Sequence, residues 1–148
     1  MAYRILFLCT GNSARSQMAE ALLRLIGGKD FLAESAGTHP VGLNPTTIVV
    51  MKELGVDVQG RRSKHVEEFR GQSFDYVITV CDRARETCPI FPGGHKLLHW
   101  SFDDPAAAPA ERRVEEFRRV RDEIADRLCA FLSEDLRIPL SDVHCYRC

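Results

Sequence analysis

The stretch LFLCTGNSARSQ at residues 6–17 decides which fold this chain can adopt. Its apolar start is typical of a buried strand that ends at Cys9, and Gly11 and Asn12 then interrupt that strand. Apolar residues return at helical spacing over residues 16–26, after which two glycines end the pattern. The stretch therefore predicts a strand, a short loop and a helix in direct succession.

Three further strands and two further helices continue this alternation. We expect strands at residues 31–35, 74–80 and 95–100, and helices at residues 44–55 and 111–136. Strands that alternate with helices form a parallel sheet. The sequence therefore predicts an α/β fold, a three-layer sandwich in which a four-stranded parallel sheet carries helices on both faces. We expect this single domain to span residues 1–138, with residues 139–148 as a C-terminal tail.

The composition is typical of a soluble cytoplasmic protein. A chain of 148 residues with 45% hydrophobic content can form one core without disulfides or a structural metal. The formal net charge of -1 gives no field that attracts nucleic acid or anionic membranes. We find no signal peptide and no membrane-spanning stretch, so we expect a cytoplasmic location. In that reducing compartment, the six cysteines indicate catalysis, redox exchange or metal binding rather than a disulfide framework.

The loop after Cys9 has the features of an oxyanion site. Glycine and asparagine tolerate left-handed backbone angles, so successive amide N–H groups can point into one concavity. The positive end of the following helix faces that concavity, and Arg15 offers a fork that grips two oxygens. The same field favours the thiolate of Cys9, to which Ser16 can donate its hydroxyl. The predicted oxyanion-binding residues are Thr10, Gly11, Asn12, Ser13, Ala14 and Arg15. The alternative is a buried strand-end cysteine beside a surface arginine.

Four segments of the chain resemble one known family. They are CTGNSARSQMAE at residues 9–20, ESAGT at 34–38, ITVCDRARETCP at 78–89 and HWSFDDPA at 99–106. Together they resemble the thioredoxin-coupled arsenate reductases that are built on the low-molecular-weight protein tyrosine phosphatase fold. The resemblance runs over residues 3–132, nearly the whole chain. It implies the same fold and a reaction that passes through three cysteines.

The resemblance implies a relay of thiols with reduced thioredoxin as the electron donor. Cys9 attacks the arsenic of bound arsenate while Arg15 and the loop amides hold the oxygens, and Asp104 protonates the hydroxyl that leaves. Cys81 then attacks Cys9 and arsenite departs, after which Cys88 attacks Cys81 and frees Cys9. No bound cofactor and no metal are implied. The implied partners are arsenate and thioredoxin, without nucleic acid or membrane, and we expect a monomer.

The positions of Cys81 and Cys88 fit such a relay. Cys81 follows a predicted strand of the same sheet as Cys9, and sites in parallel sheets lie beyond the carboxyl ends of strands. If the segment from Cys81 to Cys88 were helical, its ends would lie roughly 10 Å apart, whereas a disulfide needs Cα atoms within about 7 Å. Their pairing therefore requires the segment to unwind or loop out. The alternative is two structural thiols near a loop.

The candidate acid lies late in the chain. Asp104 precedes Pro105, in the region where the acid of the phosphatases lies. Asp103 could replace it only if the loop rotated. The alternative is an Asp–Pro turn without a catalytic role.

One position departs from the family pattern in a way that concerns cations. In some relatives a cation site near the loop is formed by Asn12, Glu20, Ser35 and an acidic residue just after Ser63. This chain has Lys64 at that last position. Its ammonium group could stand in for a potassium ion, or it could be a solvated surface charge. We expect activity with little potassium dependence.

Three cysteines take no part in the implied relay. Cys129 lies in the last predicted helix and is expected to be a small apolar core residue. Cys145 and Cys148 form a C-x-x-C pattern beside His144, which is weak evidence for a metal, because a closed zinc site takes four ligands. We expect a frayed chain end without a role. The alternative is a dithiol that shuttles electrons to the relay.

Two other functions could use the same loop. A low-molecular-weight protein tyrosine phosphatase would act through a cysteinyl-phosphate intermediate on Cys9, with Arg15 and Asp104, and would need no relay. However, the run DDPAAAPA at residues 103–110 supplies none of the aromatic walls that suit a phosphotyrosine pocket. The third possibility is a non-enzymatic oxyanion-binding or redox-sensing module, against which the acid argues.

Overall fold

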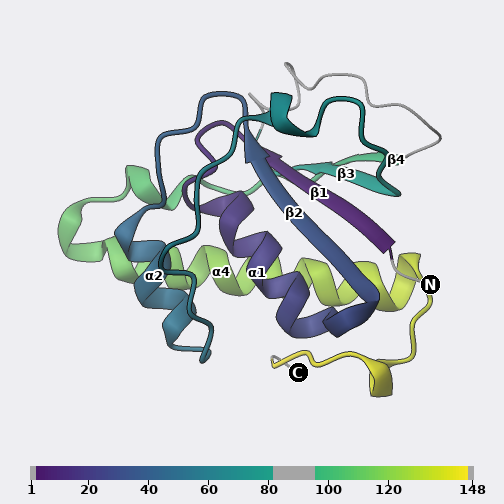
Figure 1. The fold of residues 1–148 in the computed structure, drawn as a ribbon. Coiled ribbons are helices and arrows are strands. Elements are labelled where there is room, and N and C mark those ends of the chain that lie inside the picture. The colour runs from purple at the N-terminus through teal and green to yellow at the C-terminus, as the bar shows by residue number, and fades with distance from the viewer. Residues whose placement is uncertain (1–2, 82–95, 147–148) are drawn as a thin grey trace.

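Figure 1 shows a computed structural model of the chain, which describes residues 3–81 and 96–146. The sheet contains four strands: β1 (Tyr3–Cys9), β2 (Phe31–Gly37), β3 (Tyr76–Thr79) and β4 (Lys96–His99). All neighbours run parallel, in the order β2-β1-β3-β4. The predicted α/β fold with a four-stranded parallel sheet is confirmed.

Three helices lie together below the sheet in Figure 1: α1 (Arg15–Gly27), α2 (Pro45–Lys52) and α4 (Arg113–Ala130). α1 packs against β1 and β2, α4 packs against α1, and α2 packs against α4. The last helix continues beyond α4 as a π-helical turn, Phe131–Asp135. In the described part of the chain, no helix has both the length and the apolarity that crossing a membrane requires.

The central strand explains why the sheet forms where the sequence predicts it. Ile5, Leu6, Phe7 and Leu8 of β1 have no exposed surface, because β1 has a neighbour on each side and is covered on both faces. A continuous apolar run is the pattern that such a doubly buried parallel strand requires. α2 begins where Asn44 caps it, since the Asn44 side chain accepts a hydrogen bond from the Thr46 N–H at 2.9 Å.

The strand register brings two cysteines to one edge of the sheet. Cys9 at the end of β1 lies opposite Gly37 at the end of β2. On the other side of β1, the Val80 N–H donates to the Leu8 carbonyl at 2.8 Å, and Cys81 follows directly. Cys9 and Cys81 therefore lie at the carboxyl edge that they were predicted to share. Cys88 lies outside the described residues.

The C-terminal tail differs from the prediction. Cys129 of α4 forms a disulfide with Cys145, with 6.2 Å between their Cα atoms. The backbone N–H of His144 donates to the Ile26 carbonyl at 2.8 Å, and the Val143 side chain is buried. The interpretations of Cys129 as an apolar core residue and of the tail as a frayed end are therefore wrong. No local pattern reveals this pairing, because it depends on the tail folding back along α4.

Candidate active site

The loop between β1 and α1 owes its shape to one left-handed residue. Asn12 has φ 47°, one of the left-handed angles that asparagine tolerates, whereas Gly11 is not among the residues with positive φ. Gly37 of β2 lies so close that a Cβ atom there would come within 2.5 Å of the Thr10 carbonyl oxygen. Only glycine allows this approach, so the end of β2 supports the loop directly.

The side chain of Asn12 is the centre of the hydrogen bonds beneath the loop. It is fully buried, and its Nδ2 donates to Ser16 Oγ at 2.8 Å and to Ser35 Oγ at 3.0 Å. Its Oδ1 accepts from the Lys64 backbone N–H at 2.8 Å. Asn12 was predicted to bind an oxyanion, but it lies under the pocket and does not line it. The family resemblance had grouped Asn12 with Ser35 and Glu20 near the loop, and hydrogen bonds connect these three residues.

The Cys9 sulfur receives polar contacts from two directions. The Asn12 backbone N–H donates to Cys9 Sγ at 3.2 Å, and Ser16 Oγ lies 2.8 Å from the same sulfur. Because Ser16 Oγ accepts a hydrogen from Asn12, its own hydrogen is free to point at Cys9. The predicted contact between Ser16 and the sulfur is present. The Cys9 sulfur therefore accepts two hydrogen bonds beside the N-terminal end of α1.

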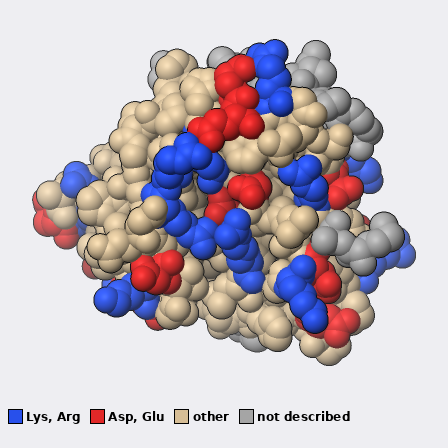
Figure 2. Space-filling model, in the orientation of Figure 1, with Lys and Arg blue, Asp and Glu red and all other residues tan. Residues whose placement is uncertain are grey.

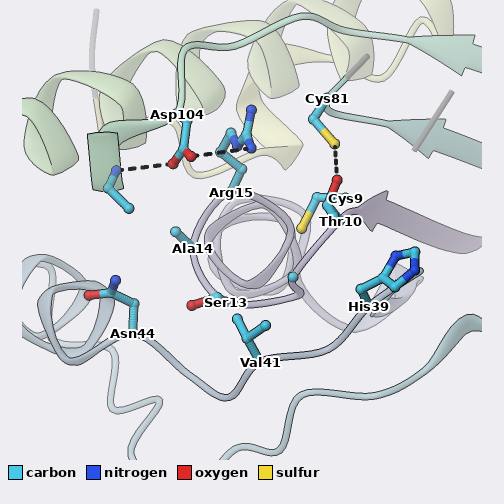
Figure 3. Close-up of a pocket in the computed structure, with 12 residues that line it drawn as sticks. Cys9, Thr10, Ser13, Ala14, Arg15, His39, Val41, Asn44, Cys81 and Asp104 are labelled. Carbon is cyan, nitrogen blue, oxygen red and sulfur yellow. Dashed lines mark hydrogen bonds and ion pairs between the residues drawn. The ribbon is translucent and has the colours of Figure 1, made fainter. Parts of the chain in front are cut away.

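An open pocket of about 530 Å³ lies above this sulfur. In Figure 3, Arg15, Asp104 and Cys81 lie on one side of it, and His39, Val41 and Asn44 lie on the other. The other lining residues are Cys9, Thr10, Gly11, Ser13, Ala14 and Ala106. Every predicted loop residue except Asn12 thus faces the pocket. No Phe, Tyr or Trp side chain from the described residues lines it.

Arg15 and Asp104 face each other across the mouth of the loop. Arg15 Nη2 lies 4.0 Å from Asp104 Oδ2, and Arg15 Nη1 donates to the Phe102 carbonyl at 3.1 Å. Asp104 Oδ1 accepts from the Ala106 N–H at 3.0 Å, which fixes the carboxylate at the start of a short turn. Asp103 points elsewhere and pairs with Arg119 at 3.1 Å. This geometry favours Asp104 over Asp103 as the acid.

Cys81 is the second thiol at the pocket. It is 5% exposed, and its sulfur lies 3.4 Å from Thr10 Oγ1, a contact that Figure 3 shows beside Cys9. Cys9 and Cys81 are both free thiols. Two unpaired, largely buried sulfurs at one pocket are what a thiol relay requires.

The opposite wall of the pocket comes from a segment that the sequence analysis did not assign. The N–H groups of His39, Val41 and Asn44 donate to the loop carbonyls of Thr10, Gly11 and Ser13, at 2.8, 3.0 and 3.1 Å. The segment follows the ESAGT motif at residues 34–38, which was the available signal. These bonds hold the loop from the side that the sheet does not reach.

The buried carboxylate of Glu20, beside the loop, is surrounded by cationic side chains. Glu20 is 2% exposed, accepts a hydrogen bond from Ser35 Oγ at 2.7 Å and forms an ion pair with Arg61. Lys64 Nζ and Arg24 Nη2 lie 3.6 and 3.5 Å from its oxygens. Figure 2 shows Lys and Arg side chains gathered across the middle of this face, with acidic atoms among them. The two Glu20 oxygens are therefore already neutralised by side chains, and they do not fit an additional bound cation.

Comparison with known proteins gives a consistent family. Residues 4–138 match the family model described as low molecular weight phosphotyrosine protein phosphatase. An arsenate reductase of Halalkalibacterium halodurans is 43% identical over 129 residues, which cover 86% of this chain and 93% of that relative.

Solved structures give the same result. One described as an arsenate reductase in oxidized state has a TM-score of 0.77 at 28% identity, covering 89% of this chain and 98% of the other. A thioredoxin-dependent arsenate reductase of Corynebacterium glutamicum has a TM-score of 0.61 at 28% identity, covering 86% of this chain and 62% of the other.

Proposed function

Because this chain belongs to the low molecular weight phosphotyrosine protein phosphatase family, we propose that it is an arsenate reductase of that family. The single observation that carries the proposal is the pair of free thiols, Cys9 and Cys81, at one oxyanion pocket with Arg15 and Asp104. A phosphatase needs only the first thiol. The second thiol, Cys81, is needed only if Cys9 is oxidised during the reaction.

Arsenate would bind as a tetrahedral oxyanion over the Cys9 sulfur. The backbone amides of the loop and the guanidinium of Arg15 would hold its oxygens. The Cys9 thiolate attacks arsenic, an As–O bond breaks, and Asp104 gives a proton to the hydroxyl, which leaves as water. The product is a covalent adduct between Cys9 Sγ and As(V).

The second step transfers two electrons to arsenic. The Cys81 thiolate attacks Cys9 Sγ, a disulfide forms, and the S–As bonding pair stays on arsenic, which leaves as As(III) in arsenite. Cys88 then attacks Cys81, which frees the Cys9 thiolate and leaves a Cys81–Cys88 disulfide. A dithiol donor reduces that disulfide and becomes oxidised itself.

We propose thioredoxin as this donor. The support is the thioredoxin-dependent neighbour and the proposed intramolecular disulfide, the form of oxidised product that a protein dithiol reduces. Since thioredoxin keeps thiols reduced in the cytoplasm, a cytoplasmic location follows from this donor.

Coupled turnover tests the proposal against plain phosphatase chemistry. NADPH oxidation is followed with thioredoxin, its reductase and arsenate, and hydrolysis of an aryl phosphate is measured beside it. The Cys81→Ser variant should lose arsenate turnover and retain aryl phosphate hydrolysis, because only the relay uses the second thiol. If Cys81→Ser kept arsenate turnover, the relay would be wrong.

Phosphate ester hydrolysis is the second candidate function. The observation that favours it is the family match itself, together with Cys9, Arg15 and Asp104 at a pocket that accepts any tetrahedral oxyanion. The absence of Phe, Tyr and Trp among the described lining residues argues against phosphotyrosine as its substrate. Weak hydrolysis of small aryl phosphates is therefore expected as a side activity.

A further inference from the structure

The Cys129–Cys145 disulfide lies far along α4 from the candidate active site. Near its beginning, α4 reaches the acid loop, since Arg119 pairs with Asp103 at 3.1 Å. Cys129 is ten residues further along the same helix, which corresponds to about 15 Å. The disulfide therefore lies well along α4 from the acid loop.

The tail beyond residue 138 is held to the domain by few contacts besides this bond. Within the described residues, the His144 N–H donates to the Ile26 carbonyl at 2.8 Å, and Val143 is the buried side chain. The Tyr146 hydroxyl donates to Asp122 Oδ1 at 2.9 Å, so the tail runs back along α4. Burial, and then the bond to Asp122, raise the pKa of the Tyr146 hydroxyl, which keeps it a donor.

Among the described residues, the tail contributes no strand to the sheet and no part of α1, α2 or α4. The family match also ends at residue 138, before the tail begins. Opening the Cys129–Cys145 bond would therefore release a short segment that lies outside these elements.

The two cysteines of this disulfide are more exposed than the two at the pocket. Cys129 and Cys145 are partly exposed, whereas Cys9 and Cys81 are only 3% and 5% exposed. Thiol–disulfide exchange requires that a thiolate reach one of the two sulfurs, so exposure favours reaction at this pair. A partly exposed disulfide near the end of a chain is more readily reduced than a fully buried one.

We propose that Cys129 and Cys145 form a second redox site, which a protein dithiol opens and a low-molecular-weight disulfide closes. On opening, the dithiol becomes a disulfide, and its two electrons and two protons convert Cys129 and Cys145 into thiols. On closing, the small disulfide takes up two electrons and two protons and is released as two thiols. The site controls whether the tail is covalently fixed to α4, and it is independent of the proposed reductase chemistry.

Closing the bond should raise thermal stability. The bond joins residues 16 positions apart and so removes conformations from the unfolded chain. A loop of this length in a domain of this size corresponds to a rise in Tm of about 5–10 °C.

The test uses the full chain with Cys81→Ser and Cys88→Ser, so that the proposed relay disulfide cannot form. One sample is treated with oxidised glutathione and another with dithiothreitol, and free thiols are then blocked before peptide mapping and thermal unfolding. We expect a peptide that links Cys129 to Cys145 only in the oxidised sample, with the higher Tm. Thioredoxin, its reductase and NADPH should remove that link.

Two variants serve as controls. Adding Cys145→Ser should abolish the difference in Tm, and Cys129→Ala should do the same. Tyr146→Phe should keep the linked peptide, since it removes only the contact to Asp122. A link from Cys145 to Cys148, or a difference in Tm that survives Cys145→Ser, would overturn the proposal.

Arsenate turnover distinguishes the proposed Cys129–Cys145 site from the relay. In the otherwise unchanged chain, Cys145→Ser should keep arsenate turnover within about twofold, because the bond lies about 15 Å along α4 from the acid loop. A folded Cys145→Ser protein without turnover would mean that the tail passes electrons to the relay, and the proposed independent site would be wrong.

Discussion

Two neighbouring aspartates show how surroundings separate the proposed catalytic carboxylate from a structural one. Asp104 lines the pocket and faces Arg15, whereas Asp103 pairs with Arg119 of α4 outside it. Sequence position alone favoured Asp104 only through the following proline, and the structure adds the direction in which each carboxylate points.

Asp104→Asn should lower kcat for arsenate about 100-fold, because a general acid contributes at least that much to proton transfer. Asp103→Asn is the matched control and should keep kcat within about twofold, since that carboxylate only forms an exposed ion pair. Steady-state kinetics with both variants measures the difference. Equal losses in the two variants would contradict the assignment of the acid.

Arg61 and Arg62 form a second instructive pair. Arg61 neutralises Glu20, which is buried, while Arg62 bonds to Glu68 at the surface. From Glu20, hydrogen bonds run through Ser35 and Asn12 to Ser16, which contacts Cys9. The sequence predicted that the Lys64 ammonium stands in for a potassium ion. In the structure Arg61 pairs with the same Glu20 carboxylate, so two side-chain cations compensate its charge.

We therefore expect that exchange of potassium for sodium changes turnover by less than about twofold, because side chains already compensate the buried charge. Arg61→Met leaves the buried Glu20 carboxylate less compensated, so the free energy of unfolding at pH 7 should fall by about 3 kcal/mol. Arg62→Met should leave the free energy of unfolding nearly unchanged, because its pair with Glu68 is exposed. Urea unfolding measures both variants, and equal losses in the two would show that Arg61 does not compensate the buried charge.

Among the elements, the contact between α2 and α4 depends on a carboxylate at the end of α2. Glu53 caps the C-terminal end of α2, and its carboxylate accepts hydrogen bonds from Arg118 Nε and Nη2 at 3.0 and 2.7 Å. Arg121, which is buried, donates to Glu53 Oε1 and to the Val50 carbonyl, both at 2.8 Å. The bonds from Arg118, and then those from Arg121, lower the pKa of Glu53 from 4.5 to about 2, although burial opposes them.

A lowered pKa means that ionised Glu53 stabilises the fold above pH 4.5, and that this contribution is lost as the pH falls toward about 2. Glu53→Gln should therefore lower the free energy of unfolding at pH 7 by about 1 kcal/mol, a value discounted for partial exposure. The difference between variant and parent should shrink toward pH 2. Urea unfolding at several pH values measures it, with the exposed Glu111→Gln as control, and a difference that stays constant with pH would contradict this role.

The elements that the sequence predicted well are those that local patterns encode. The apolar run of β1, the break at Asn12 and the periodicity of α1 lie next to one another in the chain, so a short stretch suffices. The end of α4 as a π-helical turn and the pairing of Cys129 with Cys145 depend on tertiary packing. No spacing in the sequence distinguishes those outcomes from a straight helix and a loose tail.

At the scale of the whole molecule, the pocket is assembled from four segments that the parallel sheet and its connections bring together. The loop after β1, Cys81 beyond β3 and the turn at Asp104 belonged to recognised sequence motifs and were predicted. The wall from His39 to Asn44 was missed, because its contribution consists of backbone bonds to the loop, which any side chains could accompany. The residues proposed for the chemistry were therefore easier to predict from sequence than the backbone hydrogen bonds that support the loop.

The most direct measurement is a map of the joined sulfurs after a single arsenate turnover without a reductant, made by blocking free thiols and sequencing linked peptides. The unaltered chain should contain a Cys81–Cys88 link, and Cys88→Ser should stop at a Cys9–Cys81 link. Release of arsenite with neither Cys9 nor Cys81 joined to another sulfur would contradict the relay and with it the assignment as a reductase.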